Sequence, residues 1–265
     1  MRISSVVMPA FLVLASFAAD ARADNTACEG AMLLVPDGSS HEGDLAAAPG
    51  SRWYRFVAKA GRSYALMAEN LTPGDVQPEL GITGVLNACG GSWVTANEFA
   101  DIQEPASIEP SYLVGATRQA LKVTSDAVLF FAVMDLNVTN AAHFRVRVEE
   151  TTLFSPLWST ENGIETHYRL FNTTNRPCSV TLDLRTDNDG VPSGSVSSVT
   201  FDLAANSSIS RHTGVGDLHI QNGQIGHATI THDCTPGAIL ADAFLATHAG
   251  GRVLPVKITT SRQQR

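Results

Sequence analysis

Residues 166–190, THYRLFNTTNRPCSVTLDLRTDNDG, contain the clearest strand pattern in the chain. From residue 178 to residue 185 every second position holds a cysteine or an aliphatic residue, and the polar residues between them are Ser179, Thr181, Asp183 and Arg185. Successive residues of a β-strand point to opposite faces, so this alternation predicts a half-buried strand. Cys178 is then expected on the inner, apolar face.

The end of this stretch, DNDG at residues 187–190, has the acidic composition of a calcium-binding loop. An EF-hand loop also needs an acidic residue where Arg185 stands and a carboxylate where Val196 stands, and both are missing. Asx-Gly sequences favour tight turns, because glycine takes a positive φ without steric cost. We therefore expect a turn with Gly190 in it and no calcium site.

The first 23 residues have the features of a cleaved signal peptide. These are Arg2 near the start, an apolar run too short to span a membrane, and the small-x-small sequence Ala21-Arg22-Ala23. We expect the mature chain to begin at Asp24. No second apolar run has the length of a membrane span, so the mature protein is expected to be soluble and either secreted or periplasmic.

The four cysteines are Cys28, Cys89, Cys178 and Cys234, and no C-x-x-C pair indicates a site made of thiolates. An even number of cysteines in an exported protein indicates disulfide bonds. In GQIGHATITHDC, residues 223–234, Cys234 has the same parity as the apolar residues. A bond between two inner strand faces therefore predicts the pair Cys178–Cys234 and leaves Cys28–Cys89 as the other pair.

The mature chain would carry 16 Lys and Arg against 25 Asp and Glu, because the leader contains two Arg and one Asp. An acidic protein repels phosphates and anionic lipids, so neither nucleic acid nor a membrane is an expected partner. The charge is uneven: residues 24–152 have a net charge of −8 and residues 153–265 a net charge of −1. Most of the negative field is therefore expected around the first half.

Short alternating runs rich in Val, Thr, Phe and Tyr recur between Gly, Pro, Asn and Asp residues, which predicts an all-β protein. The length allows two domains, and the boundary is expected in VEETTLFSPLW, residues 148–158, where a strand ends and Pro156 restricts the connection. We therefore predict a signal peptide at residues 1–23 and two jelly-roll-like β-sandwich domains in tandem, at residues 24–152 and 153–265.

The expected core faces of the first half follow from the same alternation. In RWYRFVAK, residues 52–59, Tyr54, Phe56 and Ala58 share the face that we expect to be buried. Near the end of the first half, Phe144, Val146 and Val148 alternate with charged residues in the same way. Both runs therefore predict strands with one buried face and one solvent face.

Four segments follow one another in the first half, namely Gly43-Asp44-Leu45, WYRFVAKAGRSYAL at 53–66, DVQPELGIT at 75–83 and LFFAVMDLNVTNAAHFRVRV at 129–148. Together they resemble the bacterial pre-peptidase C-terminal domain over about residues 36–150. The resemblance implies a jelly-roll-like sandwich of the kind appended to secreted peptidases, some relatives of which bind calcium, collagen or polysaccharide. The chain lacks an attached peptidase domain and a match to the acidic calcium cluster, so calcium is not implied.

Residues 154–190 resemble a β-sandwich module repeated in many bacterial exported proteins, through a strand, an Asn-Thr turn, a proline and a long alternating strand. This second resemblance implies a fold and no activity.

The candidate contact loop of the first half is CGGSWVTANEF, residues 89–99, in which Trp93 follows two glycines. An exposed tryptophan on a disulfide-tethered loop can stack on a sugar or anchor a protein partner. Glu98, Asp101 and Glu104 follow it in a stretch without Lys or Arg, which suits a cationic partner. The alternative is that Trp93 packs inward and that the acidic residues form a solvated face.

Six of the eight histidines lie in the second half: His167, His212, His219, His227, His232 and His248. Neither H-x-H nor H-E-x-x-H occurs, and His227 and His232 should face opposite ways on one strand. His212, Asp217 and His219 could meet across a hairpin to bind zinc or copper, or the histidines could simply be scattered. G-x-S-x-G is absent, although a triad of distant residues leaves no such motif.

These observations predict an exported, non-catalytic binding or accessory protein that engages an extracellular protein or a polysaccharide, without a cofactor or a metal. The alternatives are an exported enzyme with a metal or histidine site in the second domain, and a purely structural component of the envelope. The sequence leaves the ligand and the oligomeric state open.

Overall fold

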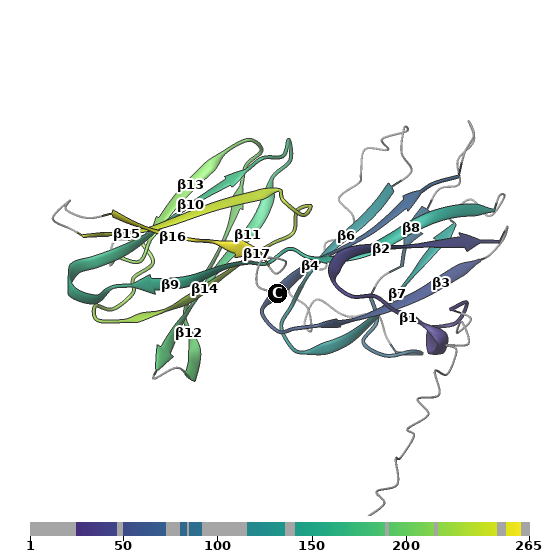
Figure 1. The fold of residues 1–265 in the computed structure, drawn as a ribbon, viewed down its shortest axis with the longest axis horizontal. Coiled ribbons are helices and arrows are strands. Elements are labelled where there is room, and N and C mark those ends of the chain that lie inside the picture. Colours follow the sequence, from purple (N-terminus) through teal and green to yellow (C-terminus); the bar gives the residue numbers. More distant parts are fainter. Residues whose placement is uncertain are drawn as a thin grey trace, which may run out of the picture.

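The computed structural model describes residues 25–46, 50–72, 80–83, 85–91, 116–135, 141–188, 191–214, 217–247 and 253–260. Among these residues the only helical elements are two short 3₁₀ turns, η1 (Cys28–Gly30) and η2 (Glu161–Gly163). All other regular structure is β-strand, in four sheets that form two sandwiches (Figure 1). The predicted all-β class is therefore confirmed.

The first sandwich, β1 to β8, consists of two four-stranded sheets. One sheet has the order β1 (Met32–Leu33), β3 (Ser51–Ala58), β7 (Ala127–Asp135) and β5 (Leu80–Ile82). The other has the order β2 (Asp37–Leu45), β8 (Ala142–Glu150), β4 (Arg62–Asn70) and β6 (Ala116–Val123). All of these pairs are antiparallel except β1 with β3.

The second sandwich, β9 to β17, consists of a four-stranded and a five-stranded sheet. The four-stranded sheet has the order β13 (Ser208–His212), β10 (Ile164–Asn172), β15 (Ile239–Thr247) and β16 (Val253–Val256). The five-stranded sheet has the order β12 (Val191–Leu203), β11 (Cys178–Asn188), β14 (Ile225–His232), β9 (Leu153–Ser159) and β17 (Thr259–Thr260). Every pair in this sandwich is antiparallel.

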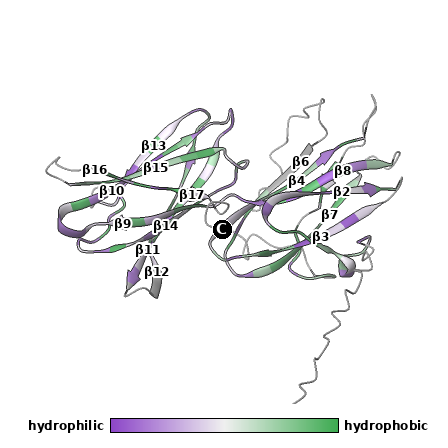
Figure 2. Cartoon of the chain, in the orientation of Figure 1, coloured by the Kyte–Doolittle hydropathy of each residue, from purple (hydrophilic) through white to green (hydrophobic). Residues whose placement is uncertain are grey.

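Each sandwich encloses its own cluster of buried apolar side chains. The first cluster lies within residues 34–148 and the second within residues 153–256, and no residue belongs to both. Figure 2 shows hydrophobic and hydrophilic residues alternating along the strands around these cores. The chain passes between the cores at Glu150, Thr151 and Thr152, all of which are buried. Independent folding of residues 24–152 and 153–265 stays a prediction.

The alternation read from the sequence describes the inner faces correctly. Tyr54, Phe56 and Ala58 are fully buried in the first core, as are Phe144, Val146 and Val148. In β11 the four residues of the inner parity are buried in the second core: Cys178, Val180, Leu182 and Leu184. Gly61, at a φ of +71°, lies in the expected tight turn between β3 and β4.

Both disulfide bonds have the pairing expected from the sequence. Cys28 is bonded to Cys89 with their Cα atoms 5.5 Å apart, and Cys178 to Cys234 with their Cα atoms 5.6 Å apart. The first bond ties η1 to the segment after β5, and the second ties the start of β11 to the segment after β14. Each sandwich is therefore cross-linked within itself.

Strand β11 extends through Asp187 and Asn188 of DNDG and pairs antiparallel with β12, with Asn188 opposite Val191. This pairing agrees with a chain reversal between β11 and β12. Asp189 and Gly190 themselves lie outside the described residues.

Candidate functional site

The loop that the sequence predicts as a contact surface lies outside the described residues. Trp93, Glu98, Asp101 and Glu104 all fall within residues 92–115, outside the described part of the chain. Their role as a contact surface stays a prediction.

Two threonines on the outer face of the five-stranded sheet are buried, although alternation alone would place that face in solvent. Thr181 has the polar parity of β11, and Thr231 lies directly opposite it on β14. Both are nevertheless buried, at 5% and 3% exposure. The cause is the first sandwich, since Leu121 and Lys122 of β6 line the same small pocket as these two threonines. Alternation within one domain could not have revealed this cover.

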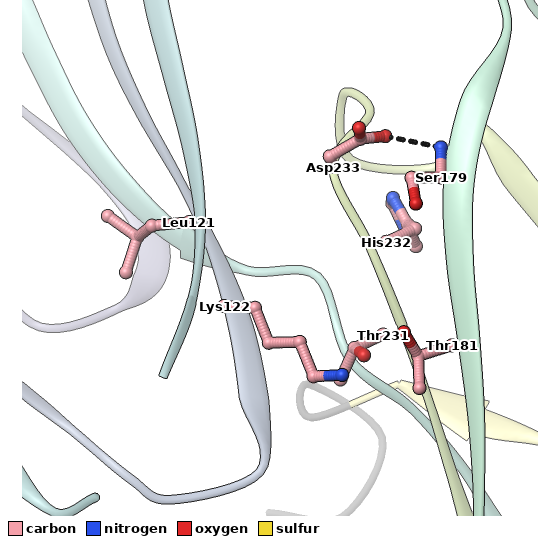
Figure 3. Close-up of a pocket in the computed structure, with 7 residues that line it drawn as sticks. All are labelled: Leu121, Lys122, Ser179, Thr181, Thr231, His232 and Asp233. Carbon is pink, nitrogen blue, oxygen red and sulfur yellow. Dashed lines mark hydrogen bonds between the residues drawn. The ribbon is translucent and has the colours of Figure 1, made fainter. Parts of the chain in front are cut away.

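This pocket lies where the two sandwiches meet. Its other lining residues come from the second sandwich: Ser179, His232 and Asp233. Figure 3 shows Lys122 reaching from the first sandwich toward Thr231, while the Asp233 carboxylate accepts a hydrogen bond of 2.8 Å from the backbone N–H of Ser179. The pocket has room for about one water molecule. It is therefore a joint between domains and not a substrate site.

Ser63, on β4, is the central residue of this joint. Its hydroxyl accepts hydrogen bonds from the Thr151 hydroxyl at 2.8 Å and from the His232 backbone N–H at 3.4 Å. Its own backbone N–H donates to the Thr152 hydroxyl at 2.9 Å. One buried serine of the first sandwich is therefore bonded to both the connection and the second sandwich.

We expect Ser63→Ala to lower the free energy of unfolding by about 1–3 kcal/mol, because two buried donors lose their acceptor. Ser198→Ala, at an exposed position of β12, is the matched control and should change stability by less than about 0.5 kcal/mol. Urea titrations of both variants and the parent measure the difference. Equal losses in the two variants would show that the Ser63 bonds do not hold the joint.

The second sandwich presents a row of four rings on the outer face of its four-stranded sheet. Strand register places His212 of β13 opposite His167 of β10, His167 opposite Phe244 of β15, and Phe244 opposite Pro255 of β16. The row faces outward, because the β10 residues of the other parity, including Tyr168, are buried in the core. We call these four residues the ring row.

Neighbouring aromatic rings in this row stack on each other. The His167 and Phe244 rings are nearly parallel, with centroids 5.0 Å apart and planes inclined by 4°. The His167 and His212 rings have centroids 5.4 Å apart and an angle of 26° between their planes. The aromatic rings therefore turn their faces toward each other.

Exposed apolar residues lie on the same outer face. Leu240 is 57% exposed, and Phe171, which lies directly opposite it in the sheet, is 38% exposed. Arg169 and Asp242 form the cross-strand pair between that apolar pair and the ring row. We call Phe171 and Leu240 the apolar border. Large apolar side chains grouped at the surface are typical of an interaction site.

Glu165 adds a carboxylate to one end of the ring row. It precedes His167 by two residues on β10 and so lies on the same face. Its Oε2 atom lies 3.3 Å from Nδ1 of His212 and 3.9 Å from Nε2 of His167. Only 14% of the Glu165 side chain is exposed.

The sequence did not single out this group, although the polar parity of IETHYRLFN at 164–172 already places Glu165 and His167 together. The grouping that it suggested instead, His212 with Asp217 and His219, does not form a ligand set. Asp217 accepts hydrogen bonds from the His212 backbone at 2.8 Å and from Arg211 at 3.4 Å. His219 is exposed and has a φ of +55°.

Two other clusters have ligand-type side chains. Within the described ranges only Cys178, Asp233 and Cys234 bring three such atoms within 4.8 Å of one another, but the two sulfurs are bonded to each other. On the first sandwich, His143 lies 2.9 Å from Asp44 and 3.7 Å from Glu42.

Arg145 already pairs with the Glu42 carboxylate of that second cluster, through a hydrogen bond of 2.8 Å that lowers the pKa of Glu42 below its usual value. His143, Asp44 and Glu42 therefore belong to a network of exposed ion pairs, which contributes little to stability.

No protein-family model matches this chain, and a search of curated proteins finds no relative. The resemblance of the first half to the pre-peptidase C-terminal domain therefore stays a prediction. No helix in the described residues is long and apolar enough to cross a membrane.

Proposed function

We propose that this chain is an exported, non-catalytic binding protein that engages an extracellular protein or polysaccharide. The observation that supports this proposal most is the outer face of the β13-β10-β15-β16 sheet, where the ring row and the apolar border lie together. The leader-like residues 1–23 and the two disulfide bonds support export to a secreted or periplasmic location.

The geometry of this face favours a protein over a sugar. A sugar stacks on an open aromatic face, whereas His167 has Phe244 on one side and His212 on the other. Leu240 of the apolar border adds exposed aliphatic area, which suits the apolar core of a protein interface. The Trp93 loop remains the candidate for carbohydrate.

We expect the double variant Phe171→Ser, Leu240→Ser to weaken binding of a protein ligand by about 2 kcal/mol or more, the range of an interface hot spot. Both side chains are exposed, so the melting temperature should hardly change. The ligand is first found by screening the mature protein against peptide and glycan arrays, and the affinities are then measured by calorimetry.

Val196→Ser is the matched control, because Val196 is 38% exposed on β12 of the other sheet. It should leave binding unchanged. Unaltered binding by the double variant, together with loss in a Trp93→Ala variant, would move the contact surface to the first domain.

A second candidate, an enzyme with a histidine site, is supported only by the approach of Glu165, His167 and His212.

A further inference from the structure

Three side chains with metal-ligand chemistry meet where β13 pairs with β10. They are the cross-strand pair His167 and His212, and Glu165 on the same face. Donor atoms that share a tetrahedral zinc ion lie roughly 3.3 Å apart, given metal–ligand bonds of about 2.0–2.1 Å. Glu165 Oε2 lies at that spacing from His212 Nδ1, 3.3 Å, and somewhat farther from His167 Nε2, at 3.9 Å.

The Nδ1 atom of His212 is a buried polar atom without a hydrogen-bond partner in the described part of the chain. The Glu165 oxygen lies 3.3 Å away, yet the two atoms do not have the geometry of a hydrogen bond. A buried nitrogen without a hydrogen-bond partner destabilises the folded state. A cation that bound both the nitrogen and the carboxylate would remove that cost.

Packing restrains two of the three ligands. The stacked Phe244 ring fixes the plane of the His167 imidazole. Gly214 lies against the Glu165 carboxylate so closely that a Cβ atom there would collide with it and would come within 2.8 Å of His212 Nδ1. Such contacts orient ligands in the way that second-shell residues do at metal centres.

The third ligand is the one able to move. The three donor atoms do not all lie within 4.8 Å of one another, so the group is more open than a closed metal site. His212 belongs to β13, the edge strand of its sheet, and is the last residue of that strand. Binding therefore requires the His212 imidazole to approach His167, and an edge position permits this shift.

We propose that Glu165, His167 and His212 bind a divalent transition-metal ion such as Zn²⁺ or Cu²⁺. Two imidazoles and one carboxylate suit these ions, whereas Ca²⁺ and Mg²⁺ take oxygen ligands. Three protein ligands leave a coordination position for water or for a group on a partner. The metal-site proposal does not depend on the proposed binding function, because metal binding can be measured without any macromolecular ligand.

The test is a calorimetric titration of untagged mature protein, treated with chelator, with Zn²⁺ and, separately, Cu²⁺. The protein is kept oxidised so that Cys178 and Cys234 offer no thiolate. We expect one ion per chain at this site. His212→Ala and Glu165→Gln should each weaken binding by at least about 10–100-fold, the loss seen even when a residue that only orients a metal ligand is changed.

Two histidine variants are matched controls. His143→Gln removes the imidazole of the ion-pair network on the first sandwich, and His219→Asn removes an exposed imidazole while tolerating the positive φ of that position. Both should bind the ion with unchanged affinity. A loss in either control with full binding by His212→Ala would overturn the proposal, as would the absence of binding by the parent.

Imidazole resonances of the parent protein give a readout that does not depend on whether a variant folds. Zn²⁺ should shift the signals of His167 and His212 and leave that of His219 in place. Unshifted His167 and His212 signals at saturating Zn²⁺ would also overturn the proposal. The double variant Phe171→Ser, Leu240→Ser should still bind Zn²⁺, which separates failure of this site from failure of the protein-binding face.

Discussion

Trp158→Ala should lower the free energy of unfolding of the second sandwich by about 3–5 kcal/mol. Trp158, on β9, is fully buried, and its indole N–H lies 3.0 Å from the Arg185 carbonyl and 2.9 Å from the His227 carbonyl. These carbonyls belong to β11 and β14, so one side chain links three strands of the five-stranded sheet. The substitution leaves a large cavity and removes that link.

The irregular strand pairing around Trp158 explains why the link matters. Gly226 lies opposite Trp158, and the register between β14 and β9 shifts just after Gly226. A Cβ atom at Gly226 would collide with the Arg185 carbonyl, so β11 and β14 approach closely at this point. The indole N–H binds carbonyls beside this irregularity, where the regular ladder is interrupted.

Trp53→Ala is the matched control, because Trp53 lies on the outward parity of β3 and is only partly buried. Denaturant titrations followed by circular dichroism avoid dependence on tryptophan fluorescence. We expect a clearly smaller loss for Trp53→Ala. A loss for Trp158→Ala no larger than that of the control would mean that this side chain does not hold the sheet together.

Local alternation in the sequence was enough to predict the inner faces of the strands. In β11 and β3 every residue that the pattern placed inward is buried, because period-two patterning reports directly on which face meets the core. The disulfide pairing followed from the same parity. Each strand face needed only residues close together in the sequence, and the disulfide pairing needed only the parity of two such strands.

The surface features could not be predicted in this way, because they depend on how strands far apart in the sequence pair with each other. His167, His212 and Phe244 belong to three strands, and only their pairing places the three rings in one row. Thr181 was assigned to the polar face and is buried for a similar reason, since first-sandwich residues line the pocket beside it.

Removal of the Cys178–Cys234 bond by a double alanine variant should destabilise the second sandwich by about 4 kcal/mol. In the chain-entropy model the loss grows with the logarithm of the loop closed, and this bond joins residues 56 positions apart. The Cys28–Cys89 bond joins residues 61 positions apart, so its removal should cost the first sandwich about the same.

The two double variants also test the domain boundary, because each bond closes a loop within one sandwich only. If residues 24–152 and 153–265 unfold separately, a calorimetric scan has two transitions, and each variant should lower its own transition while largely sparing the other. The joint around Ser63 opposes separate unfolding, because three hydrogen bonds there join the two domains and their connection. A single transition that falls equally in both variants would mean that the sandwiches unfold as one cooperative unit, with the joint contributing as much to cooperativity as either core.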